Sequence, residues 1–369
     1  MIALLTRSAA LLAAAVGLGA GAPAGAPVPP AGPKLYIVNQ SGASITVIDQ
    51  FTLTIDTVLD LKTMGFTGNA KPHHVVVEQD GSFWYVSLIG DGLVVKFDRN
   101  NHVVGQVKLE TPGLLALDPM HDSLYVGRSM TAVNPPKSLA VIKRSDFTLL
   151  EPQEIQVPRP HALLASRDGQ WVHTASLAEN RIASVATATG QVTLTTLAGV
   201  TRSLVQFAQS PDGKTMVVGG ELSNTLLVFD LTRPPPFTPV REIPLAGKPW
   251  DPMFSADGKT VFVTLFGGNA VAVVDVKHGK VRRTITGDLA QPYDLILRRD
   301  GKLLFVVNQN TGAVKPGESA HDHMPGMNGM QGMNPRDGWL SIIDVKQGKV
   351  IKTLMLGTGP TGMGAAGAR

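Results

Sequence analysis

The 369-residue chain contains no cysteine. This absence excludes disulfides, thiolate metal sites, haem attached through cysteine and lipid-modified cysteine. Stability must therefore come from packing, for which the chain is long enough. Aromatic residues make up only 5% of the chain, whereas there are 39 Gly and 26 Pro, a balance that is typical of a turn-rich all-β protein.

Long apolar runs and common catalytic motifs are also missing. After the first residues no run approaches about 20 apolar positions, so we expect no membrane span. The chain has no G-x-S-x-G, P-loop or H-E-x-x-H motif, which leaves nucleophile-elbow hydrolase, P-loop and zincin activities without support. The formal charge is only +4 and the basic residues are scattered, so we expect no nucleic-acid partner.

The N-terminus has the pattern of a secretory signal over residues 1–24. Met1–Arg7 is basic, Ser8–Leu18 is apolar and rich in Ala, and small residues follow. Residues 25–33 then form a Pro-rich leader, which we expect to be extended. These segments predict a periplasmic or secreted protein, which we expect to be a monomer.

The rest of the chain repeats one unit, seen most clearly in Lys248–Gly287. This unit has four short alternating runs, separated by Gly, Asn and Asp pairs that are typical of tight antiparallel turns. Its second strand recurs seven times, at intervals of 40 to 49 residues: Tyr36–Asn39, Tyr85–Leu88, Tyr125–Arg128, Val172–Ala175, Val217–Gly220, Phe262–Leu265 and Phe305–Asn308. A four-stranded repeat of this length predicts a β-propeller.

The two ends of the repeat region predict how the ring closes. The first repeat starts on its second strand, and after the last repeat the chain continues into Gly359–Ala366, which matches the start of a first strand. We therefore expect residues 34–369 to form a seven-bladed propeller of four-stranded antiparallel blades, with the C-terminal strand pairing into blade one so that no sheet edge is left open.

The motifs YIVN (Tyr36–Asn39), SPDGK (Ser210–Lys214) and SADGK (Ser255–Lys259) resemble those of the YVTN-repeat family of seven-bladed propellers, over nearly all of residues 34–366. The resemblance implies the fold. It implies little about activity, because relatives include lactone hydrolases, haem and copper oxidoreductase domains and surface-layer proteins.

Most inner strands begin with Pro, and the residues that follow are expected at the mouth of the central channel. Blade five lacks this Pro, and its alignment is open by two or three residues. Together these positions predict a ligand funnel of His73, His74, His161, Arg202, Trp250, Asp251, Tyr293 and Asp294. The three His could bind a metal, with the Asp side chains as ligands or as partners of the imidazoles. Alternatively, these polar groups satisfy buried backbone around a water-filled channel.

Adjacent residues of a strand point to opposite faces. His73 and His74 can therefore both face the channel only if the strand bulges there.

A segment rich in Met and His interrupts blade seven between its second and third strands, over residues 315–337. Soft thioethers beside imidazoles favour Cu(I), and in an extended chain a Met at every third position lies on one side. The segment predicts a Cu(I) site made of His321, His323, Met324, Met327, Met330 and Met333. By strand parity the segment should lie on the same face as the funnel, as should Met64 and Met130.

Three functions remain open from the sequence, of which the third is a surface or scaffold protein without a small-molecule site, whose funnel would be plugged by apolar side chains. In the first, the chain is a non-catalytic binding protein, with a small ligand or a protein partner at the funnel and with copper bound by the Met/His-rich segment. In the second, it is an enzyme, either a copper-dependent oxidoreductase or a lactonase-type hydrolase, that uses the His, Asp and Arg residues of the funnel. We favour the first and assign no catalytic residue.

Overall fold

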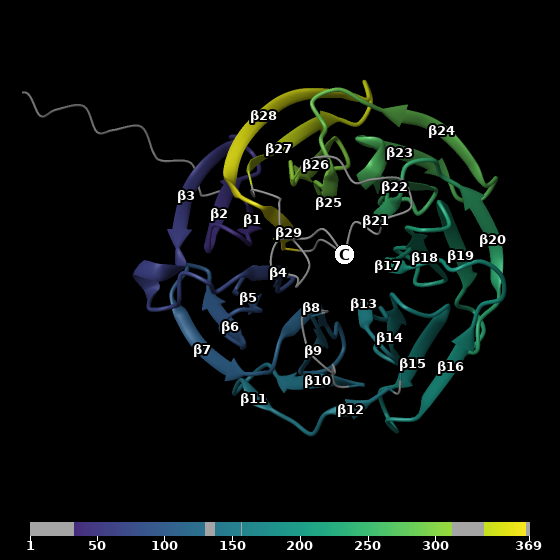
Figure 1. Ribbon diagram of the computed structural model, residues 1–369, viewed down its shortest axis with the longest axis horizontal. Coiled ribbons are helices and arrows are strands. Elements are labelled where there is room, and N and C mark those ends of the chain that lie inside the picture. Colours follow the sequence, from purple (N-terminus) through teal and green to yellow (C-terminus); the bar gives the residue numbers. More distant parts are fainter. Residues whose placement is uncertain (1–32, 130–136, 156, 312–335, 367–369) are drawn as a thin grey trace, which may run out of the picture. The chain divides into compact units, whose positions relative to one another are not determined.

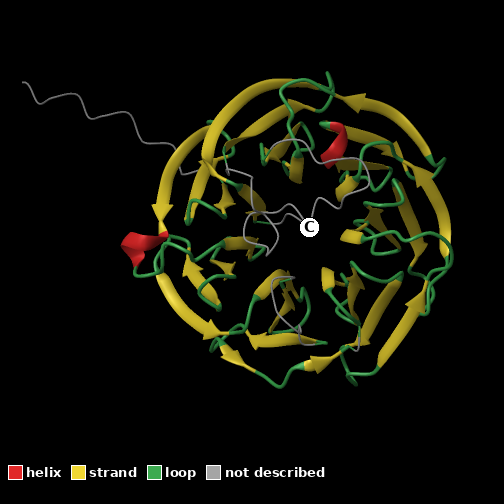
Figure 2. Cartoon of the chain, viewed as in Figure 1, coloured by secondary structure: helices red, strands yellow, loops and turns green. Residues whose placement is uncertain are grey.

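The computed structural model describes residues 33–129, 137–155, 157–311 and 336–366. These residues form seven antiparallel sheets in a ring (Figure 1), which confirms the predicted all-β, seven-bladed propeller. Apart from strands and loops, the described residues contain two short 3-10 helices, η1 (Leu61–Met64) and η2 (Phe266–Gly268) (Figure 2). The predicted signal peptide at residues 1–24 and all but the last residue of the leader at 25–33 lie outside the described residues.

Blades two to four follow each other along the chain, and each blade runs from its inner strand to its outer strand. Blade two contains β4 (Pro72–Val77), β5 (Phe83–Leu88), β6 (Leu93–Asp98) and β7 (Val103–Lys108). Blade three contains β8 (Pro112–Leu117), β9 (Ser123–Arg128), β10 (Ser138–Lys143) and an outer edge of two short strands, β11 (Thr148–Leu149) and β12 (Gln153–Glu154). Blade four contains β13 (Pro160–Ala165), β14 (Trp171–Ser176), β15 (Arg181–Ala186) and β16 (Val192–Thr196).

Blades five to seven have the same order. Blade five contains β17 (Leu204–Gln209), β18 (Thr215–Gly220), β19 (Thr225–Asp230) and β20 (Pro239–Pro244). Blade six contains β21 (Pro249–Phe254), β22 (Thr260–Leu265), β23 (Ala270–Asp275) and β24 (Lys280–Ile285). Blade seven contains β25 (Pro292–Leu297), β26 (Leu303–Asn308), β27 (Asp337–Asp344) and β28 (Lys349–Thr358).

Blade one joins the two ends of the ring. Its outer strands are β1 (Lys34–Asn39), β2 (Ser44–Asp49) and β3 (Thr54–Asp60), and its inner strand is β29 (Pro360–Ala365). β29 runs antiparallel to β1, with Met363 opposite Ile37. The predicted closure by the C-terminal strand is therefore confirmed, and it gives β1 a hydrogen-bonded partner on its inner side.

The core lies between neighbouring blades, because each sheet buries apolar side chains on both faces. Between blades one and two, the Trp84 ring stacks on Tyr36 at 4.4 Å and on Phe97 at 4.0 Å between ring centres. All three side chains belong to one buried cluster that draws on both blades. The ring is thus held by side-chain packing, as the absence of cysteine requires.

Each inner strand has an irregular start. In all seven blades the register between the inner strand and its neighbour shifts within the first residues, as between Pro72 and His74 in blade two. In blade five the inner strand begins at Leu204, three residues after Thr201. These bulged starts surround the central channel and position the residues of the candidate site.

Candidate functional site

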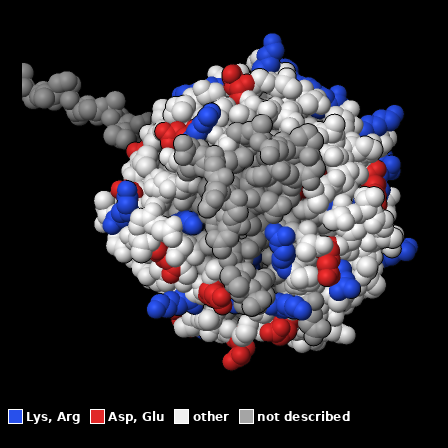
Figure 3. Space-filling view, in the orientation of Figure 1, with Lys and Arg blue, Asp and Glu red and all other residues white. Residues whose placement is uncertain are grey.

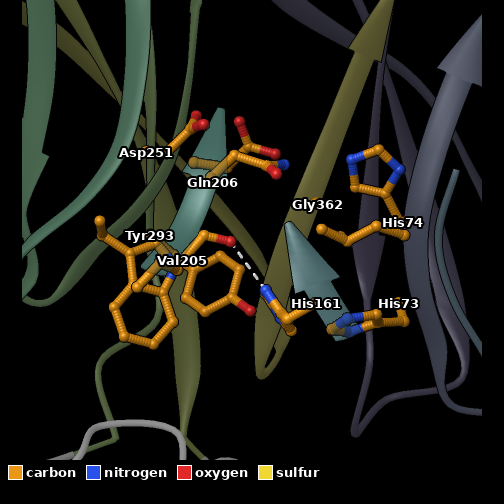
Figure 4. Close-up of a pocket in the computed structure, with 11 residues that line it drawn as sticks. His73, His74, His161, Val205, Gln206, Asp251, Tyr293 and Gly362 are labelled. Carbon is orange, nitrogen blue, oxygen red and sulfur yellow. Dashed lines mark hydrogen bonds between the residues drawn. The ribbon is translucent and has the colours of Figure 1, made fainter. Parts of the chain in front are cut away.

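A cavity of about 20 Å³ lies where the inner strands begin (Figure 4). That volume is room for about one water molecule. Its lining brings together seven of the eight residues predicted for the funnel, with four others: His73, His74, His161, Trp250, Asp251, Tyr293 and Asp294, and Leu114, Val205, Gln206 and Gly362. All seven predicted residues are buried.

His73 and His74 both line this cavity, although they are adjacent in β4. The strand bulges between Pro72 and His74, as this arrangement requires, and the regular pairing resumes with His74 opposite Ser87. The Ser87 hydroxyl accepts a hydrogen bond of 3.2 Å from the His74 backbone N–H. The bulge therefore turns two consecutive imidazoles toward the same space.

Three of the lining side chains hold the backbone of the next blade. The Leu115 N–H donates to His74 Nδ1 at 3.2 Å, the Leu295 N–H to Asp251 Oδ2 at 3.1 Å, and the Met363 N–H to Asp294 Oδ2 at 2.8 Å. Each acceptor lies at the second position after the Pro that starts its strand, and each donor lies on the following inner strand. These side chains thus satisfy backbone N–H groups of the inner strands, which have no further strand on their inner side.

His73 and His161 are held differently, through carbonyl oxygens. Nδ1 of His161 donates to the Val205 carbonyl at 2.8 Å, and Nδ1 of His73 lies 3.2 Å from Oε1 of Gln40 (Figure 4 shows the first bond). A carbonyl oxygen only accepts, so Nδ1 is the donating nitrogen of each ring in these two contacts. The two ring centres are 6.5 Å apart, with an interplanar angle of 71°.

Blade three, which lies between the blades of these two rings, has glycine at the corresponding position. The residue of blade three that corresponds to His73 and His161 is Gly113, so blade three adds no imidazole at this position, although the next residue, Leu114, lines the cavity. A Cβ at Gly113 would lie 2.8 Å from the Arg128 carbonyl carbon. A larger residue at this position would thus displace the backbone at the start of β8 or at the end of β9.

The opposite wall is aromatic. The Trp250 and Tyr293 rings lie 5.2 Å apart, and Phe266 stacks on Trp250 at 4.9 Å. Burial raises the pKa of Tyr293, and the nearby carboxylates of Asp294 and Asp251 raise it further, so its phenol stays protonated at all physiological pH values. This wall is therefore an uncharged surface facing the imidazoles.

Arg202 lies outside the cavity, so its predicted place in the funnel is wrong. Its guanidinium makes two hydrogen bonds with Glu242 of the outer strand β20, at 2.9 and 3.0 Å, and a third with the Ala198 carbonyl. Because β17 begins at Leu204, Val205 and Gln206 occupy the positions in blade five that the sequence predicts for Arg202 and its neighbours. The inner strand of blade five does not begin with Pro, so the sequence does not show where this strand aligns with the others.

Gln40 is the partner that sequence reasoning missed. It follows the second strand of blade one directly, and the corresponding residues of blades five and seven are also polar and buried, Glu221 and Gln309. An alignment of the residues that follow each second strand predicts that Gln40, Glu221 and Gln309 occupy equivalent positions. It does not show that Gln40 contacts His73.

The residues of the predicted Cu(I) site in the Met/His-rich segment, His321, His323, Met324, Met327, Met330 and Met333, lie outside the described residues, as does Met130. Met64 belongs to η1 and packs against the core of blades one and two. Within the described ranges, no group of three or more His, Asp or Glu side chains is arranged to hold a metal ion.

Comparison with known proteins supports the fold and no more. No family model matches the chain, and no curated protein matches it. Its resemblance to the YVTN-repeat family therefore stays a prediction.

Solved structures do match. A functionally unknown protein from Desulfotomaculum acetoxidans is 14% identical (TM-score 0.70; 90% of this chain and 98% of that one). The dihydro-heme d1 dehydrogenase NirN is 16% identical (TM-score 0.60; 90% and 75%), and a 6-phosphogluconolactonase candidate from Bacteroides uniformis is 14% identical (TM-score 0.65; 91% and 100%). At these identities the likeness shows a shared fold alone.

The surface agrees with the scattered charges of the sequence. On the face shown in Figure 3, Lys and Arg side chains are interspersed with Asp and Glu around the ring. In the part of the chain that the structure describes, no helix is long and apolar enough to span a membrane.

Proposed function

We propose that this protein is an extracytoplasmic binding protein that holds one Cu(I) ion between His73 and His161. The observation that carries the proposal is the pairing of the two rings: their centres lie 6.5 Å apart, and Nδ1 of each contacts a carbonyl oxygen. A hydrogen bond from the second ring nitrogen to a carbonyl is the usual support of a metal-binding histidine.

The spacing and the donor number favour Cu(I) over other ions. Two metal–nitrogen bonds of about 2 Å each, added to the distance from each ring centre to its Nε2, span close to the observed 6.5 Å. Cu(I) is a d¹⁰ ion that is stable with two nitrogen ligands in a line, whereas Zn²⁺ takes four ligands. His74 does not complete a larger set, because its Nδ1 accepts the Leu115 N–H.

The volume supports a single ion as the occupant of this cavity. About 20 Å³ admits one small atom and excludes a lactone ring, so the alternative of a lactonase-type hydrolase finds no support at this position. A copper-dependent oxidoreductase remains the second candidate, since copper held by two imidazoles could give one electron to an acceptor as Cu(I) and regain it from a donor as Cu(II). The Met/His-rich segment would serve as an additional thioether site for copper.

Competition titrations with a chromogenic Cu(I) chelator test the proposal. We expect that His73→Ala and His161→Ala each weaken Cu(I) binding at least about tenfold in a variant lacking Glu318–Pro335. His102→Ala is the matched control, because His102 is exposed and contacts Asp98 on an outer turn. If the deletion variant binds no copper, or binds it equally with and without His73, the proposal is wrong.

A further inference from the structure

A second and larger cavity runs along the axis of the ring from the other side. Its volume is about 490 Å³, which is within the usual range of small-molecule pockets. It extends from His74 and Gln206 to the turns that join each inner strand to the next strand, and all seven inner strands contribute to its wall. From Gln206 to Pro211 it spans five residues, or about 16 Å of strand.

The wall of this channel is mainly apolar. Side chains such as Val77, Leu117, Leu163, Phe254 and Met363 line it between the two ends. At its inner end the buried Oε1 of Gln206 has no hydrogen-bond partner among the described residues. A ligand in this channel would therefore gain mostly from apolar burial, with one polar atom at its far end.

Cationic side chains stand at the opening. In blades two to seven, the second residue of the turn after the inner strand lines the channel: Gln79, Pro119, Arg167, Pro211, Ala256 and Arg299. Two of these six residues are Arg. Arg167 belongs to blade four and Arg299 to blade seven. These blades lie on opposite sides of the ring axis, as β13 and β25 in Figure 1 show.

The other charges at this opening are already paired. Arg144 holds Glu78 at 2.8 Å, and Arg298 holds Asp300 at 2.7 Å. The carboxylate of Asp118 accepts the backbone N–H of Met120 and lies 3.1 Å from the His121 ring.

Arg167 and Arg299 differ from these groups. Within the described ranges neither guanidinium makes a hydrogen bond or an ion pair. Burial lowers the pKa of Arg167, and no neighbouring carboxylate counteracts this effect. Both side chains are nonetheless exposed at the channel opening, where an incoming anion can reach and pair with both guanidinium groups.

We propose that this channel binds one amphipathic organic anion, whose apolar body lies along the inner strands and whose anionic group is held by Arg167 and Arg299. The channel shares His74 and Gln206 with the smaller cavity, but its two Arg side chains stand at the other end, and the proposal does not depend on copper. It predicts selectivity for ligands that carry one negative charge at the end of an apolar body.

Two fluorescent probes of the same shape test the proposal. 1-Anilinonaphthalene-8-sulfonate is an amphipathic anion, and N-phenyl-1-naphthylamine is its uncharged counterpart. We expect the mature protein to bind one equivalent of the sulfonate, and at least about tenfold more tightly than the amine. Arg167→Gln and Arg299→Gln should each weaken sulfonate binding about tenfold or more and leave amine binding unchanged.

Two further variants control this experiment. Arg99→Gln removes an exposed Arg from an outer turn of blade two, and it should change neither affinity. Ala165→Phe fills the channel from β13 and should abolish binding of both probes, provided that thermal unfolding shows a folded ring. Equal affinity for the two probes, or sulfonate binding that is insensitive to Arg167 and Arg299, would overturn the proposal.

Discussion

At the scale of single residues, the buried histidines differ in what their ring nitrogens contact. His74 accepts a backbone N–H, whereas His73 and His161 donate to carbonyl oxygens. His173 lies in β14, whereas His161 lies in the inner strand β13 of the same blade. Nδ1 of His173 contacts the Ser184 hydroxyl at 2.9 Å. The sequence shows all four imidazoles, but only the hydrogen-bond partners separate a structural histidine from a candidate ligand.

His173 predicts a pH dependence of stability. Burial lowers its pKa to about 4, so the folded protein keeps it neutral where the unfolded chain, at the ordinary value of 6.5, takes up a proton. This contribution is fully present above pH 6.5 and is lost as the pH falls to about 4, with a size of about 3 kcal/mol. Urea unfolding at pH 7 and pH 4.5 should show a clearly smaller loss for His173→Asn than for the wild type.

The hydrogen bond between Asp294 of blade seven and the Met363 N–H of blade one should contribute measurably to stability. Asp294→Ala would leave the buried Met363 N–H without its acceptor and should lower the free energy of unfolding by about 1–3 kcal/mol. Asp294→Asn retains an oxygen at this position and should lose less. Chemical denaturation measures both, and equal losses would indicate that packing of the side chain matters rather than the hydrogen bond.

At the scale of elements, the bulged start of each inner strand explains which site residues the sequence could predict. The Pro before His73, His161, Trp250 and Tyr293 identified these positions correctly as neighbours of the channel. The bulge that both His73 and His74 need in order to face it is present in β4, but it depends on pairing with β5, which the sequence does not show. Blade five has no Pro at the start of its inner strand, so the sequence predicts a start at Thr201, three residues before the observed start at Leu204, and wrongly assigns Arg202 to the funnel.

The close approach of β29 to β4 requires glycine at position 362. A Cβ at this position would lie 2.7 Å from the His73 carbonyl oxygen and 3.0 Å from the His74 Cα. Gly362→Ala should therefore displace backbone and cost about 1–3 kcal/mol of stability. Gly68→Ala is the control, since the nearest atom to its Cβ would be Cδ of the flexible Lys62 side chain at 3.8 Å. Similar thermal midpoints for the two variants would contradict this prediction.

At the scale of the whole molecule, nearly all of the fold could be predicted. The seven copies of the second strand, the incomplete first repeat and the extra C-terminal strand together predicted the number of blades and the closure of the ring. Repeats make this possible because each blade gives the same signal again. Blade three shows the limit, since its outer edge is split into β11 and β12 rather than one strand.

Closure predicts that a short deletion at the C-terminus affects the entire ring. Removing residues 359–369 deletes β29, which exposes the inner edge of β1 and removes Met363 and Ala365 from a core shared with blade seven. We expect this variant to aggregate or to lose its cooperative unfolding transition. Removing only residues 367–369 should leave the elution volume and the unfolding midpoint unchanged.

The proposed Cu(I) site, in which two imidazoles at the channel mouth hold one ion, is tested most directly by X-ray absorption at the copper edge. The sample is the variant lacking Glu318–Pro335, loaded with one equivalent of Cu(I). We expect two nitrogen ligands at about 2 Å in a linear arrangement, and loss of this signature in His161→Ala. Sulfur ligands, three or more nitrogen ligands, or an unchanged spectrum in His161→Ala would contradict the proposal.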